Sequence, residues 1–166
     1  MFAVAFAAFR DFVPLYAVYA LLFQAEGLSE TAISALFLIW SITAFLAEVP
    51  SGALADLMSR RLLLALGSLL TGLGFVLWLL VPTFAGFAAG FIMWGIGGAL
   101  GSGTWQSLVY DALAHRGAAD RYAGVIGGGE SAGWLAAVAS AALTTPLLAS
   151  GGYDLVGWTS VGVAVV

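Results

Sequence analysis

The sequence contains no cysteine, few charged residues and a single histidine. Charged residues make up 8% of its 166 positions. The absence of cysteine excludes disulfide bonds and thiolate chemistry, and one histidine without cysteine supplies no recognisable set of metal ligands. The net charge is −4 and no basic stripe is present, which excludes nucleic acid as a partner. We therefore expect no cofactor, no metal and no nucleic-acid partner.

Hydrophobic residues in long runs dominate the sequence instead. They make up 62% of the chain, and the mean hydropathy is +1.05, whereas soluble domains contain roughly 45–50% apolar residues. A membrane crossing takes about 20 mostly apolar residues, and the sequence holds several such runs. A transmembrane barrel would show short alternating segments. The predicted fold is therefore all-α, a multi-pass membrane protein with the lipid bilayer as its first partner.

Polar and helix-breaking residues divide the apolar sequence into six runs. Ser29 is suited to cap the second helix, and Pro50 with Ser51-Gly52 is expected to end it. The sixth run is shorter than the roughly 20 residues of a crossing, so the sequence is expected to be a fragment that stops within a sixth helix. One six-helix unit is predicted over 1–166, with helices at about 2–23, 31–49, 62–81, 84–113, 122–148 and 155–166.

Glycines spaced four residues apart indicate close packing between helices. In lipid, this spacing lets two backbones approach and gain dispersion contacts. The pairs with this spacing are Gly86 and Gly90, Gly97 and Gly101, Gly124 and Gly128, and Gly129 and Gly133.

Two loops carry the arginines that lie outside the first helix. Arg60 and Arg61 lie between the second and third helices, and Arg116 and Arg121 lie between the fourth and fifth. Because arginine-bearing loops stay in the cytoplasm, both loops and the N-terminus are predicted to be cytoplasmic. No basic segment precedes the first apolar run, which is therefore interpreted as a membrane helix and not as a signal peptide.

The loop between the second and third helices contains a motif. Residues 52–56 are Gly-Ala-Leu-Ala-Asp, and Arg60-Arg61 and Leu64 follow. This motif resembles the signature that the major facilitator superfamily carries in the same loop, with Leu57 and Ser59 in place of a basic residue and a glycine. One branch of that superfamily is also similar at segments 48–51 and 110–113.

The resemblance implies that the chain is the N-terminal six-helix half of a twelve-helix secondary transporter. Such a protein moves a small solute across the cell membrane by alternating access, for example as an efflux permease. It needs a second six-helix half, from the same polypeptide or another chain.

In the family, the aspartate and arginine of this loop hold the two halves together on the cytoplasmic side. The arginine also pairs with an acid at the end of the fourth helix, which here is Asp111. Asp56 and Arg60 are four residues apart, a spacing that allows contact on one helical turn. The alternative is that these charges only set the orientation of the chain. The expected gate residues are Glu48, Gly52, Asp56, Arg60, Arg61 and Asp111.

Charged residues also lie within the apolar runs. Arg10 and Asp11 belong to the first helix, and Glu130 lies in the fifth among glycines. Ionisable groups within a membrane usually face a cavity, so these three are candidates for substrate binding or ion coupling. Arg10 could instead extend its charge to the bilayer surface, and Glu130 could instead form a hydrogen bond between helices. The other candidate cavity residues are Tyr16, Tyr19, Trp94, Trp105 and Gln106, with helix packing as the alternative for the last three.

Two other functions are alternatives to transport. An intramembrane serine protease needs a base within hydrogen-bond reach of its serine. Ser102 lies between glycines in the fourth helix, but the one histidine, His115, belongs to a charged loop. We therefore predict no catalytic residues and no enzyme. The second alternative is a six-helix membrane fragment that dimerises or does not transport.

Overall fold

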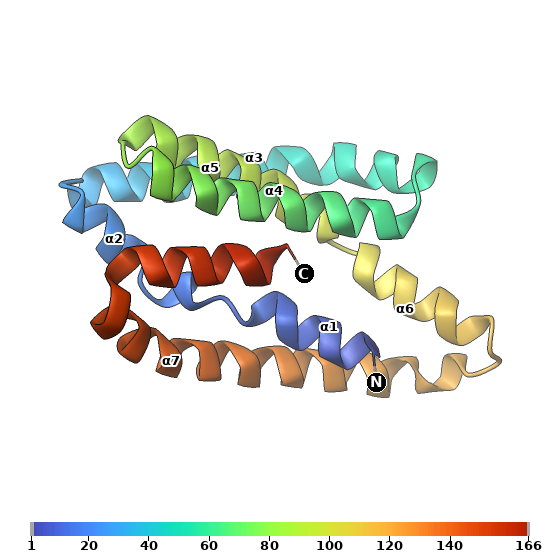
Figure 1. Cartoon of the computed structure of the whole chain (residues 1–166). Coiled ribbons are helices and arrows are strands. Elements are labelled where there is room, and N and C mark those ends of the chain that lie inside the picture. The colour runs from blue at the N-terminus through green and yellow to red at the C-terminus, as the bar shows by residue number, and fades with distance from the viewer. Residues whose placement is uncertain (1, 166) are drawn as a thin grey trace.

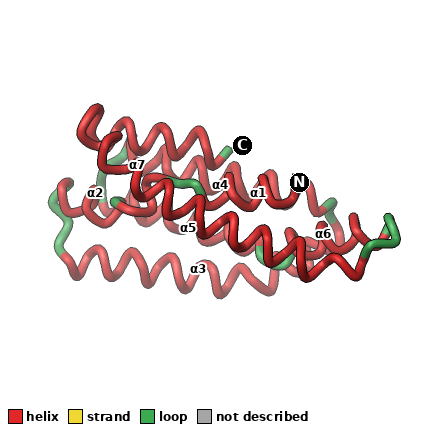
Figure 2. Tube along the Cα trace, turned by 90° about the horizontal axis from the view of Figure 1, so that it is seen from below, coloured by secondary structure: helices red, strands yellow, loops and turns green. Residues whose placement is uncertain are grey.

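Helices account for 88% of the residues that the computed structural model describes. The structure describes residues 2–165, the first two of them by their backbone alone, and this part contains no strand. Figure 2 shows long helices joined by short loops, so the all-α prediction is confirmed. In chain order the elements are α1 (Phe2–Asp11), the 3-10 helix η1 (Pro14–Ala17), α2 (Tyr19–Ala25), α3 (Glu30–Leu57), α4 (Arg60–Leu80), α5 (Phe84–Gly101), α6 (Thr104–Ala114), the 3-10 helix η2 (Ala119–Arg121) and α7 (Tyr122–Ala164).

Among the described residues, four helical stretches are long and apolar enough to cross a membrane. Such lengths and compositions are characteristic of a membrane protein. Figure 1 shows the connections gathered at two ends of the bundle, with the α3–α4 and α6–α7 connections at one end and the α2–α3 and α4–α5 connections at the other. The two arginine-bearing loops therefore share an end. The four stretches are Glu30–Leu57, Arg60–Leu80, Phe84–Ala114 and Ala119–Ala164.

Side-chain caps begin three of these helices. The hydroxyl of Ser29 accepts a hydrogen bond from the backbone N–H of Ala32 at 3.2 Å, which confirms the predicted cap. Ser59 and Thr83 accept in the same way from the N–H three residues further on, at 3.3 and 3.2 Å. Each cap satisfies a donor that the first helical turn leaves free.

The second and fourth predicted helices differ from the structure. α3 continues through Pro50 to Leu57, so the prediction that this proline ends the helix is wrong. Prolines are tolerated within membrane helices. The missing N–H of Pro50 leaves the carbonyl of Leu46 without its partner in the helix, and the neighbouring Ser51 hydroxyl donates to a different carbonyl, that of Glu48, at 2.7 Å. The stretch predicted as one helix over 84–113 is divided into α5 and α6, where Gly103 has a φ of 68° that favours glycine.

The α7 stretch bends at the glycine pair where a turn was expected. Gly151 and Gly152 have non-helical backbone angles, and Gly152 has a positive φ of 63°. Figure 1 shows the chain turning back at this point, so that its last segment lies beside α1 and α4. α7 therefore has two arms, 122–150 and 153–164, which run in opposite directions.

Aromatic side chains form the core between α2, α4 and α5. Trp78 is fully buried, and its indole N–H donates to the carbonyl of Phe87 at 3.0 Å. The rings of Phe23, Phe75 and Phe91 surround it with centroids 5.1, 5.4 and 4.8 Å away. These tilted and edge-to-face arrangements are those that ring quadrupoles favour.

Glycines bring the backbones of α4 and α5 together. A Cβ atom on Gly67 would lie 2.7 Å from the carbonyl oxygen of Gly97, and one on Gly74 would lie 2.7 Å from that of Gly90. Only glycine fits at such positions without a shift of the backbone. Five of the glycines predicted to pack have a neighbour on another helix within the described residues, namely Gly90, Gly97, Gly128, Gly129 and Gly133. A Cβ at Gly101 or Gly124 would meet nothing within 4 Å.

The helix predicted over 2–23 is broken between α1 and η1, and α7 satisfies the freed backbone groups. The N–H of Leu15 donates to the hydroxyl of Ser160 at 2.9 Å, and the carbonyl of Pro14 accepts from the hydroxyl of Thr144 at 3.0 Å. Both hydroxyls are buried. They come from the two arms of α7, so the break is held from both sides, as irregular backbone within a membrane requires.

Replacing Ser160 with alanine should lower the free energy of unfolding by about 1–3 kcal/mol, because the buried N–H of Leu15 loses its acceptor. Thermal unfolding in detergent micelles measures the change. Ser150→Ala is the matched control, since the exposed Ser150 bonds only to carbonyls of its own helix. Equal losses in the two variants would contradict the role given to the Ser160 hydroxyl.

Candidate functional site

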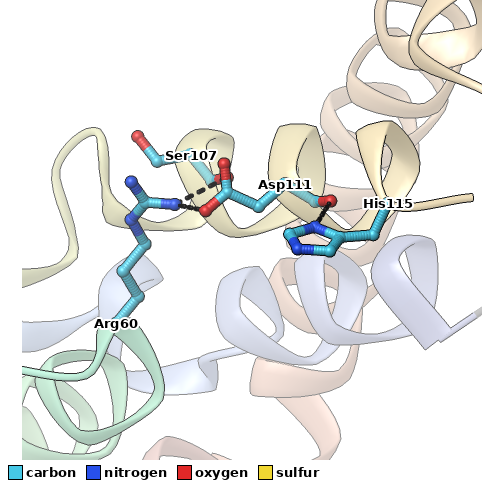
Figure 3. Close-up of polar contacts among 4 residues, drawn as sticks. All are labelled: Arg60, Ser107, Asp111 and His115. Carbon is cyan, nitrogen blue, oxygen red and sulfur yellow. Dashed lines mark hydrogen bonds and ion pairs between the residues drawn. The ribbon is translucent and has the colours of Figure 1, made fainter. Parts of the chain in front are cut away.

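An ion pair joins α4 to α6 at the end of the bundle that carries the arginines. Arg60, the first residue of α4, pairs with the carboxylate of Asp111 and also donates to the carbonyl of Ser107 at 3.3 Å (Figure 3). The Ser59 cap and the helical turn that begins at Arg60 fix the direction of the arginine. The two side chains are 35% and 48% exposed, so water still reaches the pair and weakens it.

Asp56 does not share a helical turn with Arg60. α3 ends at Leu57, and Met58 and Ser59 are extended before α4 begins. The prediction of a contact along one turn is therefore wrong, because the helix is interrupted between the two residues. Asp56 is exposed at the end of α3, and Gly52, also exposed, has open space where a side chain would lie.

Glu48 connects α3 to the break between α5 and α6. Its carboxylate accepts a hydrogen bond from the hydroxyl of Ser102 at 2.8 Å. Sequence reasoning missed this contact, since nothing in the sequence places Ser102 beside Glu48. The ring of His115 lies 2.7 Å from the carbonyl of Asp111 (Figure 3), so the serine and the histidine have different partners.

A cavity of about 440 Å³ lies between α1, α4 and the α5–α6 break, within the range of roughly 300–1,000 Å³ of small-molecule sites. Arg10 donates to the neighbouring Asp11 at 3.1 Å on its wall, and the rings of Tyr16 and Trp94 are stacked at 5.0 Å. The predicted residues that line it are Arg10, Asp11, Tyr16, Trp94 and Gln106.

Further cavity residues were missed from the sequence. Ser68 and Thr71 of α4 line the wall opposite α1, beside Gly67. In the sequence Ser68 and Thr71 look like ordinary helix-packing residues. Only their place in the same cavity lining as Arg10 marks them as candidate site residues. Gln106 adds an acceptor, because its buried Oε1 has no hydrogen-bond partner among the residues that the structure describes.

Glycines of α7 allow α1 to pack closely against α7, and this packing positions the pair of Arg10 and Asp11. The Cβ of Ala7 lies 3.5 Å from where a Cβ of Gly129 would be, and a side chain at Gly133 would collide with the carboxylate of Asp11. This close approach lets Asp11 lie between α1 and α7 while Arg10 bonds to it.

Three predicted residues lie outside this cavity. Tyr19 packs in the aromatic core, where its ring lies 5.9 Å from that of Trp78. Trp105 is buried and stacks on Phe6 with a centroid distance of 5.1 Å. Glu130 is half-buried on α7 and is not part of the cavity lining.

Comparisons with protein-family models, with curated proteins and with solved structures find no match to this chain. The features that bear on function are therefore the motif residues, the ion pair between Arg60 and Asp111 and the cavity.

Proposed function

We propose that the chain is a six-helix half of a secondary transporter of the major facilitator type, which moves a small solute by alternating access. The observation that carries the proposal is the ion pair between Arg60 and Asp111, since the motif resemblance predicts this pairing and nothing in the local sequence requires it. The pair lies at the end of the bundle that holds both arginine-bearing connections.

The orientation of the proposed transporter follows from its arginines. The end of the bundle with Arg60, Arg61, Arg116 and Arg121 faces the cytoplasm by the positive-inside rule. The N-terminus is then cytoplasmic, and the chain enters the cell membrane six times, the last time through the second arm of α7.

Two contacts close the cytoplasmic end of the cavity in this proposal. The Arg60–Asp111 pair ties α4 to α6, and the Glu48–Ser102 bond ties α3 to the α5–α6 break. Breaking them would let helices at this end separate as rigid bodies, the usual form of such a switch. Solute in the cavity would then contact Arg10, Asp11 and Gln106.

A second six-helix half is the protein partner in this proposal. Only 11% of the apolar window of α3 and 17% of that of α7 is buried, against 44% for the stretch Phe84–Ala114. Side chains such as Phe45 and Trp134 are 79% and 74% exposed. We assign these apolar surfaces to lipid and to the second half.

Removing the charge of Asp111 should open the cytoplasmic end. The chain has no cysteine, so Gly98→Cys, at a cavity-lining position with open space for a side chain, supplies a single reporter. In inside-out vesicles, a membrane-impermeant maleimide should label this cysteine about fivefold faster when Asp111→Asn is added. The factor of about five corresponds to the loss of about 1 kcal/mol from a half-exposed charged contact.

Asp120→Asn is the matched control, because Asp120 is exposed in η2 and belongs to neither described ion pair. Its labelling rate should equal that of the parent. An unchanged rate in Asp111→Asn, or an equal rise in both variants, would remove the support for a gate.

A further inference from the structure

A second, mostly apolar groove lies between α4, α6 and the beginning of α7. Its volume is about 620 Å³. Most of its lining side chains are aliphatic, such as Leu69, Val109 and Leu113. Phe6 of α1 and the buried ring of Trp105 complete it. Such a surface next to a bilayer suits a hydrocarbon chain.

Two arginines stand at this groove without an acidic partner. Arg61 belongs to the first turn of α4 and Arg116 follows α6, and both line the groove and are exposed. Across the described residues, the ion pairs are those of Arg10 and Arg60 with their acids. Arg61 and Arg116 therefore leave an uncompensated positive charge beside an apolar volume.

A further donor lies in the lining of the groove. The indole N–H of Trp105 is buried and has no acceptor in the part of the chain that the structure describes. The charge recognition therefore comes from the arginines, and an occupant that carries only hydrocarbon would leave their charge uncompensated. An occupant with an anionic, oxygen-rich head and an apolar tail matches the charge and the lining together.

We infer that this groove binds an anionic phospholipid. Its acyl chain lies along the aliphatic wall of α4 and α6, and its phosphate lies between the guanidinium groups of Arg61 and Arg116. Arginine binds phosphate oxygens through paired, charge-assisted hydrogen bonds, and basic pockets between membrane helices are suited to anionic headgroups. This groove adjoins the proposed solute cavity, with which it shares Phe6, Leu64 and Ser68. Arg61 and Arg116 line only the groove, and lipid binding there does not depend on transport.

Native mass spectrometry of the purified chain in detergent tests the site. The probes are dioleoyl phosphatidylglycerol and dioleoyl phosphatidylcholine, which share their acyl chains and differ in headgroup charge. The anionic lipid should be retained at least about fivefold more strongly. The double variant Arg61→Gln with Arg116→Gln should remove this preference for the anionic lipid. Each of the two substitutions should lower the retention of the anionic lipid about fivefold.

Arg121→Gln is the control for charge alone, since it removes an arginine from the same end of the bundle but outside the groove lining. It should leave the preference intact. Ala65→Trp, which fills the groove on the α4 side, should lower retention of both lipids. Excess inorganic phosphate should not displace the lipid, because the acyl chain contributes to binding.

Four results would overturn the inference. They are equal retention of the two lipids, an equal loss in Arg121→Gln, displacement by inorganic phosphate, and a lipid-free dimer whose interface covers the groove.

Discussion

Trp78→Ala should lower the free energy of unfolding by about 3–5 kcal/mol, the usual cost of removing a buried large aromatic side chain. Trp78 is fully buried among the rings of Phe23, Phe75 and Phe91. The substitution removes many dispersion contacts and leaves a cavity that these rings cannot fill without moving. Titration with a denaturing detergent, followed by circular dichroism, measures the loss.

Two companion variants separate the contributions to this effect. Trp78→Phe keeps most of the ring and removes only the donor to Phe87, so it should cost about 1 kcal/mol. Trp158→Ala removes the same atoms from a side chain that is 48% exposed, and it should change stability little. If Trp158→Ala proved as damaging as Trp78→Ala, the aromatic core would not be the source of the stability.

Gly97→Ala should lower the free energy of unfolding by about 1–3 kcal/mol, because the added methyl group has no room between α4 and α5. The added Cβ would lie 2.6 Å from the carbonyl oxygen of Gly67 and 2.8 Å from the hydroxyl of Thr71. A backbone carbonyl cannot rotate away, so the two helices must separate and lose contacts along their length. The same unfolding titration measures the effect.

Gly98→Ala is the matched control for this change. Gly98 is the next residue of the same helix, and its added Cβ would meet nothing within 4 Å. Alanine favours the helix over glycine, so this variant should be neutral or stabilised by up to about 1 kcal/mol. A loss of stability in Gly98→Ala as large as that in Gly97→Ala would show that helix propensity, and not the contact with Gly67, decides the outcome.

The helical fold and the membrane character follow from the sequence because both depend on the length and polarity of the apolar runs. The ends of those runs are less predictable. Pro50 lies within α3 because membrane helices tolerate a proline that would usually end a helix elsewhere, and the residue itself does not show which of the two outcomes applies. The break at Gly103 lies among glycines such as Gly97 and Gly98 that remain helical, and a permissive residue does not reveal which conformation it adopts.

The candidate site was predictable where single residues are unusual for their surroundings. Arg10 and Asp11 stand out as charges in an apolar run, and both line the cavity. Ser68 and Thr71 do not stand out, because small polar residues are common in membrane helices. The Asp56 prediction failed because helical spacing applies only within an unbroken helix, and the interruption at Met58 and Ser59 is set by the turn between α3 and α4.

The hydrogen bonds that hold the break at Pro14 and Leu15 also constrain the order of assembly during synthesis. Leu15 and its acceptor Ser160 are 145 residues apart, and Pro14 and Thr144 are 130 apart. A ribosome releases the break well before it releases these partners, so the backbone groups of the break stay unsatisfied while the intervening helices are made. The segment around Pro14 and Leu15 reaches its final conformation only when both arms of α7 have been made. The second arm of α7 therefore completes the folding of this segment.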